Sequence, residues 1–302
     1  MKLNLTSTGG SKATLLPERG GLLSSLNLTT PSGEKSEVLW LSPEFDSSGS
    51  GWPSGGMPLM FPFAGRVFSG LEPFKYKLDE KIWQMPLHGF AFAQKWQVIS
   101  ATADMIELSL STSEGSRLLF PFDFEVRTRY LLSDDYLLTE TKVTCLDSFS
   151  PITKSMPFAI GWHPYFRLPA SDHEQVKGRF KLTTSARTQF NVTSAGAAGM
   201  ESPFPTGSAG DCSDLANPHL SNLILGQIES TEAQIESPEG GPVINLEWDP
   251  AFRYLVLWTQ QGKGFHCVEP WMGLPDALNN GAGLAWLAPS QSFTTWFKIG
   301  IR

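Results

Sequence analysis

The stretch Phe124–Tyr130 reads FEVRTRY, in which charged residues alternate with uncharged, mainly apolar ones. Successive side chains of a β-strand point to opposite faces, so this stretch predicts a strand with one buried face. Strand patterns, some of them looser, recur in Met105–Leu110, Tyr136–Leu146, Pro242–Trp248, Tyr254–Thr259 and Phe293–Ile299. The chain is therefore expected to be mainly β.

Turn-forming residues separate these strands. They occur at Ser113–Ser116, Ser133–Asp135 and Gln261–Gly264. No long amphipathic helix is apparent, and Asp276–Leu278 is expected to form one short helical turn at most. Many short strands joined by tight turns favour an all-β fold, a large antiparallel β-sandwich, over an α/β fold.

Two segments break the strand pattern, Ser42–Gly56 and Thr193–Pro218. Both are rich in small and polar residues, and each is expected to form a long loop, a kind of segment that is often functional. Neither has the composition of a linker that leads into a second core, and no internal repeat is present. Residues 1–302 are therefore expected to form a single domain.

The composition excludes several classes of function. The 302 residues carry a net charge of −7 and no basic run, which argues against nucleic acid and anionic membranes as partners. The three cysteines match no metal-binding spacing and suit a reducing compartment. Neither a signal sequence nor an apolar stretch of the ~18 residues that a span needs is found. We expect a cytoplasmic protein.

His163 and Glu269 have the same local setting, because each directly precedes a proline. A following proline disfavours helical geometry and holds the residue extended. Pro164 also lacks the amide donor that a sheet needs, so its strand is expected to lie at an edge or to end there. Both side chains should therefore be held stiffly near a sheet boundary. A structural, hydrogen-bonded role for His163 is the alternative.

Extended geometry places Glu269 on one strand face with Phe265, Cys267 and Trp271. A carboxylate on an otherwise apolar face is costly unless it has partners, which favours a functional role. Trp271 could stack on the apolar side of a sugar ring, although packing in the core is the alternative. Cys267 is expected to be a core residue.

His88 and Arg66 are further candidates. Gly89 follows His88 and would let a ligand or another backbone approach closely. Arg66 follows an apolar, proline-bearing stretch, so its cation must either pair with a buried carboxylate or bind another polar group. No local spacing of His and Glu residues forms a metal-ligand pair, and no phosphate-binding loop or nucleophile elbow is present.

Four separated motifs resemble those of the aldose 1-epimerase, or galactose mutarotase-like, family. They are FAGR at residues 63–66, LHGF at 87–90, GWHPYF at 161–166 and VEPW at 268–271; LPDALN at 274–279 also resembles the segment after the family's glutamate. Their order and wide separation carry the resemblance. It implies a galactose mutarotase-like supersandwich that interconverts sugar anomers without a metal or other cofactor.

The resemblance also assigns roles. Glu269 would be the general base at the C1 hydroxyl, and His163 the general acid at the ring oxygen. His88 would orient the sugar near its ring oxygen, and Arg66 would bind a hydroxyl or brace the site. The family's loop aspartate would correspond to Asp211 or Asp214, of which Asp211 is the first choice.

Some residues depart from the galactose-specific pattern. Phe90 after His88-Gly89, and Pro164 after His163, are more similar to the broader group that includes hexose-6-phosphate mutarotases. Lys75 and Lys77 could then bind a phosphate, with a solvated strand face as the alternative. The resemblance leaves open whether the substrate is a free or a phosphorylated aldose. The protein is expected to be a monomer or a homodimer. A non-catalytic sugar-binding protein on the same scaffold is the competing hypothesis.

Overall fold

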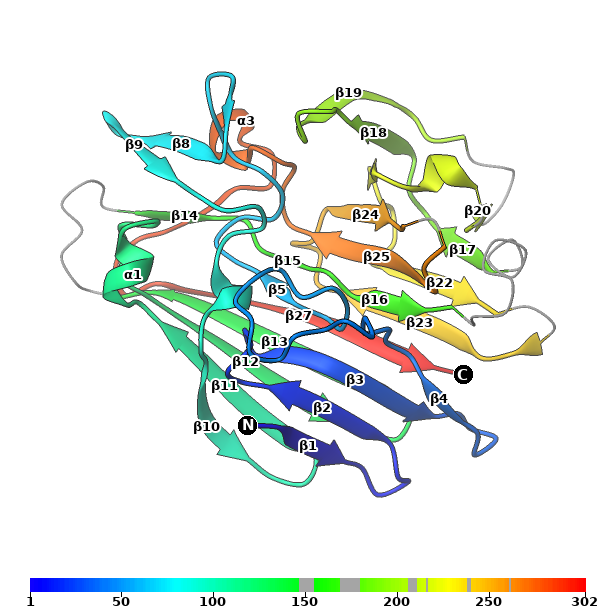
Figure 1. Ribbon diagram of the computed structural model, residues 1–302. Helices are drawn as coiled ribbons and strands as arrows, with labels where there is room; N and C mark the ends of the chain where they lie inside the picture. The colour runs from blue at the N-terminus through cyan, green and yellow to red at the C-terminus, as the bar shows by residue number, and fades with distance from the viewer. Residues whose placement is uncertain (147–154, 169–179, 206–210, 216, 238–239, 261) are drawn as a thin grey trace.

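The computed structural model describes residues 1–146, 155–168, 180–205, 211–215, 217–237, 240–260 and 262–302, without the side chains of residues 211–214. Most of the regular structure is antiparallel β-sheet, as the alternation in the sequence predicts. Most of the described strands form two large sheets and one four-stranded sheet, which are layered against each other in Figure 1.

The largest sheet has nine strands. Their order is β10 (Gln97–Ala101), β11 (Met105–Ser111), β12 (Phe124–Leu132), β13 (Tyr136–Cys145), β27 (Ser292–Ile301), β23 (Val243–Trp248), β22 (Glu232–Glu236), β17 (Lys181–Thr184) and β20 (Asp211–Asp214). In β12 every second residue is buried, starting at Phe124, which is the period of the sequence. The C-terminal strand β27 lies inside this sheet, between β13 and β23.

A second sheet has eight strands. Its path is β19 (Ala198–Pro203), β18 (Thr188–Val192), β21 (Leu223–Gly226), β24 (Tyr254–Trp258), β25 (Phe265–Trp271), β15 (Gly161–Trp162) and β5 (Leu59–Met60), and β16 (Tyr165–Arg167) also pairs with β25. The third sheet has four strands, β1 (Leu3–Thr6), β2 (Lys12–Leu16), β3 (Leu22–Thr29) and β4 (Lys35–Glu37).

One hydrophobic core joins the sheets. It contains Leu26 of β3, Val143 and Phe297 of the nine-stranded sheet, and Leu257 and Val268 of the eight-stranded sheet. Burial of such side chains stabilises the fold by about 25 cal/mol for each Å² of apolar surface removed from water. The side chains of the eight-stranded sheet that alternate with these face away from this core.

The remaining elements are short. Three two-stranded sheets pair β6 (Phe68–Ser69) with β7 (Glu72–Pro73), β8 (Lys75–Leu78) with β9 (Lys81–Gln84), and β14 (Met156–Phe158) with β26 (Ala285–Leu287). The described helices are α1 (Glu114–Arg117), α3 (Ala277–Asn280), and the 3-10 turns η1 (Ala91–Ala93) and η2 (Pro218–Leu220). Among the described residues, no helix has the length and apolar character that crossing a membrane requires.

Two local predictions need correction. Thr193–Pro218 is not one continuous loop, because it contains β19 and β20, whose backbones pair with β18 and β17. Ser113–Ser116 forms the N-cap and the first residues of helix α1 rather than a simple turn. There Ser113 and Ser116 cap each other's backbone amides, which satisfies donors that the start of a helix leaves open. Ser42–Gly56 contains no named strand or helix, as expected for a loop.

Candidate active site

A cavity of about 290 Å³ lies on the outer face of the eight-stranded sheet. Its walls include Arg66, His88, His163, Glu269 and Trp271, which are five of the six site residues expected from the sequence. Small-molecule sites in proteins typically measure roughly 300–1,000 Å³. The cavity is therefore near the lower limit of that range, which suits a ligand of the size of a monosaccharide.

Strand β25 explains where the cavity lies. Val268 points into the core between the sheets, whereas Glu269 and Trp271 line the cavity on the opposite face. All seven residues of β25 are buried, because both faces of the strand are covered. The alternation expected for this strand is confirmed.

His163 lies at a break between two short strands. Gly161 pairs with Trp271 and Tyr165 pairs with Cys267, while His163 and Pro164 belong to neither β15 nor β16. The strand thus ends at Trp162, just before His163-Pro164, and the end that Pro164 predicts is found in this region. This break places the imidazole against the neighbouring strand β25.

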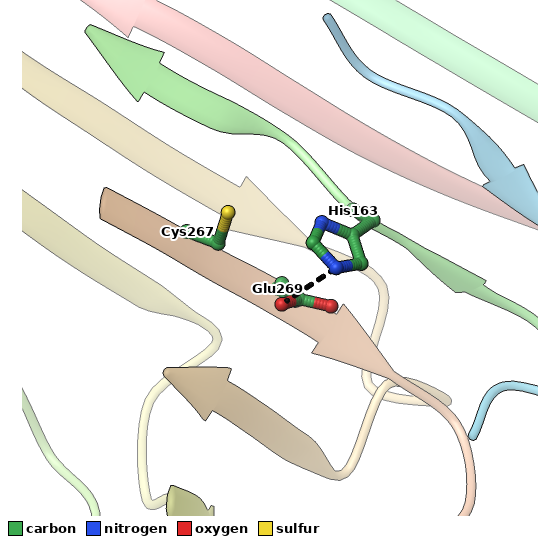
Figure 2. A group of neighbouring side chains, drawn as sticks. All are labelled: His163, Cys267 and Glu269. Carbon is green, nitrogen blue, oxygen red and sulfur yellow. Dashed lines mark ion pairs between the residues drawn. The ribbon is translucent and has the colours of Figure 1, made fainter. Parts of the chain in front are cut away.

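His163 and Glu269 form a buried pair. Nε2 of His163 lies 3.2 Å from Oε1 of Glu269, and the two side chains are 6% and 1% exposed. Figure 2 shows the imidazole above β25 with Nε2 directed at the carboxylate. The second carboxylate oxygen, Oε2, accepts a hydrogen bond of 2.9 Å from Nε1 of Trp271. Trp271 therefore fixes the carboxyl group as well as lining the cavity.

Burial shifts the two ionisable groups in opposite directions. It raises the pKa of Glu269 well above its usual value, and the Trp271 hydrogen bond opposes this rise only in part. Burial, with a smaller contribution from His88, lowers the pKa of His163 well below its usual value. Both groups are therefore driven towards their neutral forms, which leaves one proton for the pair to exchange.

Aromatic rings surround His163. Tyr165 stacks on it with ring centroids 4.8 Å apart, and Trp52 and Trp258 present edges at 5.1 and 5.8 Å. Nε1 of Trp52 donates a hydrogen bond of 2.9 Å to the Tyr165 hydroxyl, which fixes both rings. Such rings offer apolar surfaces that pack against the C–H groups of a sugar.

His88 presents a defined tautomer to the cavity. Its Nδ1 accepts a hydrogen bond of 3.1 Å from the Gly65 amide, so the proton of the neutral ring is on Nε2. Burial, with a smaller effect from Arg66, lowers the pKa of His88 to about 3. The ring is therefore neutral at physiological pH and acts as a hydrogen-bond donor, which agrees with an orienting role.

The backbone around His88 is sterically constrained. His88 and Gly89 have φ angles of 64° and 75°. A Cβ on Gly89 would lie 2.0 Å from the Phe61 carbonyl oxygen, so only glycine fits there without displacing the backbone. The close approach expected at Gly89 is thus made by another backbone segment.

Arg66 lies half-buried at the cavity wall. Its Nη1 donates a hydrogen bond of 2.6 Å to the Ala195 carbonyl, and its guanidinium lies 4.9 Å from the centre of the Phe74 ring. No carboxylate among the described residues forms an ion pair with it. The expected polar partner is therefore a carbonyl, and the guanidinium still has donors that could bind a ligand.

The other candidates lie elsewhere. Lys75 pairs with Glu72 and Lys77 with Glu80, and neither lysine lines the cavity. This favours the solvated strand face over phosphate binding. The backbones of Asp211 and Asp214 lie in β20, paired with β17 in the other sheet, and their side chains are outside the described residues. A contact between Asp211 and substrate stays a prediction.

Several wall residues were not predicted. Trp52, Tyr165, Asn222 and Trp258 line the cavity, together with aliphatic side chains from Leu87, Val192, Ile224 and Val256. Trp52 comes from the Ser42–Gly56 loop, where a lone tryptophan among Ser, Gly and Pro was the available signal. Val256 pairs directly with Glu269, a register that the sequence of its strand does not specify.

Cys267 joins His163 and Glu269 in a mixed group of possible metal ligands. The ligand atoms of the three residues all lie within 4.8 Å of one another, and all three residues are buried. Cys267 also packs with Tyr165 and Phe265, as expected of a core residue. Local spacing did not reveal this group because the fold, not the sequence, brings His163 beside β25.

The fold agrees with comparisons to known proteins. A family model for aldose 1-epimerase matches residues 1–300, so the chain belongs to the aldose 1-epimerase family. Its relatives include protein LacX of Lactococcus lactis subsp. lactis, 25% identical over 255 residues that cover 81% of each chain.

Solved structures show the same fold. The Slr1438 protein of Synechocystis sp. PCC 6803 superposes with a TM-score of 0.82 at 26% identity, covering 100% of this chain and 95% of that one. A galactose mutarotase-like protein from Lactobacillus casei ATCC 334 gives a TM-score of 0.81 at 24% identity, with 100% of both chains covered. The expected galactose mutarotase-like fold is confirmed.

Proposed function

We propose that this protein is an aldose 1-epimerase that interconverts the α and β anomers of an aldose. The observation that carries the proposal is the buried His163–Glu269 pair, 3.2 Å apart in an aromatic-walled cavity of monosaccharide size. The two oxygens that exchange protons in this reaction, the C1 hydroxyl and the ring oxygen, are bonded to the same carbon. A base and an acid this close together can reach both.

Ring opening needs one proton removed and one supplied. The one proton that the pair holds first moves from the Glu269 carboxyl group to Nε2 of His163. The resulting carboxylate of Glu269 then takes the proton from the C1 hydroxyl while protonated His163 gives its Nε2 proton to the ring oxygen. The bond between C1 and the ring oxygen breaks, and the C1 hydroxyl oxygen becomes a carbonyl oxygen. The pair passes from a carboxylate and an imidazolium to a carboxylic acid and an imidazole, so its net charge does not change.

Closure reverses these transfers. The C1–C2 bond of the open chain rotates and presents the other face of the aldehyde. Glu269 then returns its proton to the carbonyl oxygen, and neutral His163 accepts the proton of the attacking hydroxyl. The opposite anomer forms, and the pair returns to its starting state without a net gain or loss of protons.

The pKa shifts support these directions of transfer. A raised pKa makes the Glu269 carboxylate a stronger base, and a lowered pKa makes the His163 imidazolium a stronger acid. General acid or base catalysis typically contributes about 10²- to 10⁴-fold to a rate. Neutral His88 would donate its Nε2 proton in a hydrogen bond near the ring oxygen, and Arg66 would bind a polar substituent at the cavity wall.

Polarimetry tests the proposal directly. Freshly dissolved α-glucose, α-galactose and glucose-6-phosphate would be followed with and without the protein. Faster approach to the equilibrium rotation is expected for at least one sugar, and the sugar affected distinguishes a free from a phosphorylated substrate. Measurable binding without acceleration of any sugar would instead favour a carbohydrate-binding protein.

A further inference from the structure

The group formed by His163, Cys267 and Glu269 contains one more functional atom than the proton exchange uses. The proposed reaction needs Nε2 of His163 and the carboxylate of Glu269, whereas Cys267 does not line the cavity and takes no part in it. Cys267 and Glu269 lie two residues apart on β25, so they project from the same face of the strand. Figure 2 shows the three side chains around one small region of β25.

We infer that this group is a binding site for a thiophilic divalent cation of the Zn²⁺ class, and that the cation inhibits the enzyme reversibly. Imidazole nitrogen, thiolate sulfur and carboxylate oxygen are the three donor types of protein zinc sites. Three protein ligands leave a fourth position, which here faces the cavity lined by His163 and Glu269.

The geometry suits a tetrahedral ion. Two ligands that each lie about 2.1 Å from such an ion are roughly 3.4 Å apart. Nε2 of His163 and Oε1 of Glu269 are already 3.2 Å apart. The sulfur lies within 4.8 Å of both ligand atoms, so the three donor atoms surround one small region.

The charges also suit the site. Binding releases the proton of the thiol and the proton shared by the pair, which leaves a thiolate and a carboxylate to balance the two charges of the ion. A neutral complex avoids most of the cost of placing an isolated charge among the buried rings of Tyr165 and Phe265. Mg²⁺ and Ca²⁺ prefer shells of six or more oxygen ligands, which one carboxylate cannot supply.

The ion and the sugar compete for the same atoms. A bound ion occupies the lone pairs of His163 and Glu269 that carry the protons in ring opening, so inhibition should be complete and removable with a chelator. This part of the inference rests on the proposed function, whereas binding of the ion does not. Calorimetry and activity therefore separate the two claims.

The first experiment is calorimetric titration of the full chain with ZnCl₂ in a non-coordinating buffer. One ion per chain is expected for the wild type. Cys267→Ser should weaken binding by more than the 10- to 100-fold that loss of an outer partner typically costs. Cys145→Ser is the matched control, because Cys145 is also buried and outside any disulfide but lies in β13 of the other large sheet. Equal affinity in wild type and Cys267→Ser would overturn the inference.

A spectroscopic probe identifies the sulfur ligand. Co²⁺ in place of Zn²⁺ should give a thiolate-to-cobalt charge-transfer band in the wild type and in Cys145→Ser, and none in Cys267→Ser. Melting curves without metal establish that each variant is folded. A Co²⁺ complex without the charge-transfer band in the wild type would contradict the assignment of Cys267.

The activity measurement addresses inhibition. With a sugar that the wild type turns over, Zn²⁺ should abolish acceleration, EDTA should restore it and Mg²⁺ should have no effect. The turnover that Cys267→Ser retains should be resistant to Zn²⁺. If Zn²⁺ binds but no sugar is turned over, the metal site stands and the proposed function fails; if turnover proceeds unchanged with Zn²⁺ bound, the inhibitory role is wrong.

Discussion

The burial of Glu269 lowers the stability of the folded protein at neutral pH. Its folded-state pKa is raised by burial, so the folded protein keeps this proton at a pH where the unfolded chain has lost it. Because the unfolded state then binds fewer protons, the contribution of this group to stability falls as pH rises above the ordinary glutamate pKa. The Glu269 carboxyl group therefore destabilises the folded state at neutral pH.

This cost predicts the behaviour of Glu269→Gln. The amide keeps an oxygen for the Trp271 hydrogen bond and removes the ionisable group. We expect the variant to be more stable than the wild type at pH 8 and to lose this advantage as pH falls towards 4. Melting temperatures across that range measure the difference. A constant difference between the two proteins at every pH would show that Glu269 does not titrate as argued.

A second prediction about a single residue concerns His88. Asparagine tolerates positive φ better than most residues, so His88→Asn can keep the backbone at φ 64° while it removes the ring donor. Loss of one hydrogen bond should raise KM by about tenfold, which corresponds to ~1.4 kcal/mol. Initial rates against sugar concentration measure this. The exposed His219 provides the control variant His219→Asn, and equal KM values for both variants would exclude an orienting role for His88.

Sequence reasoning found the residues of the pair but not its environment. His163 and Glu269 each have a local signal, a following proline, and both belong to recognisable motifs. Trp258 and Cys267 have no such signal, since their proximity to His163 arises only when β16 and β24 pair with β25 on either side. Contacts across strands depend on register, which the alternation of a single strand does not specify.

A close contact between the backbones of Gly89 and Phe61 holds the segment that carries His88 in place. The Gly89 backbone forms a bridge with Phe61, and the space that a Cβ would need is occupied by the Phe61 carbonyl. This contact connects the segment that carries His88 to the stretch that leads to Arg66. Displacement of one should therefore disturb the other.

Gly89→Ala and Gly33→Ala separate crowding from backbone strain. Both glycines have positive φ, 75° and 88°, but a Cβ at Gly33 would have nothing within 4 Å. Gly33→Ala should cost about 1–2 kcal/mol of unfolding free energy, the typical penalty of this conformation. Gly89→Ala should cost clearly more and also lower activity. Denaturant unfolding measures both, and equal losses would mean that the contact with Phe61 is unimportant.

The elements themselves were largely predictable where alternation was long. The strand expected at Phe124–Tyr130 lies within β12, and the one expected at Phe293–Ile299 lies within β27. The two-residue strands β5 and β15 could not be predicted, because two residues show no period. The β19 and β20 strands were missed since their small and polar residues resemble a loop, and pairing with neighbouring strands overrides that local preference.

For the whole molecule, the last strand is central. β27 pairs with β13 on one side and β23 on the other, and so joins the two halves of the nine-stranded sheet. Its buried residues Phe297, Ile299 and Ile301 belong to the core between the sheets. We therefore expect deletion of residues 292–302 to abolish cooperative unfolding. Thermal melting followed by circular dichroism checks this, and a transition at the wild-type temperature would contradict it.

The layered sheets support the buried His163–Glu269 pair. Glu269 lies on β25, and His163 lies in the two-residue break between β15 and β16, which both pair with β25. The relative position of the two side chains is therefore set by strand pairing rather than by a long loop. This support from the packed sheets also explains how the molecule can retain two buried ionisable groups that each oppose folding when charged. The central claim is that these two groups together open and close the sugar ring.

Glu269→Gln tests that claim most directly. With a sugar that the wild type turns over, polarimetry should show a fall in mutarotation rate of about 10²- to 10⁴-fold. Glu229→Gln is the control, because Glu229 is an exposed carboxylate paired with Arg187, and its rate should equal that of the wild type. Folded Glu269→Gln with the wild-type rate of mutarotation would contradict the account.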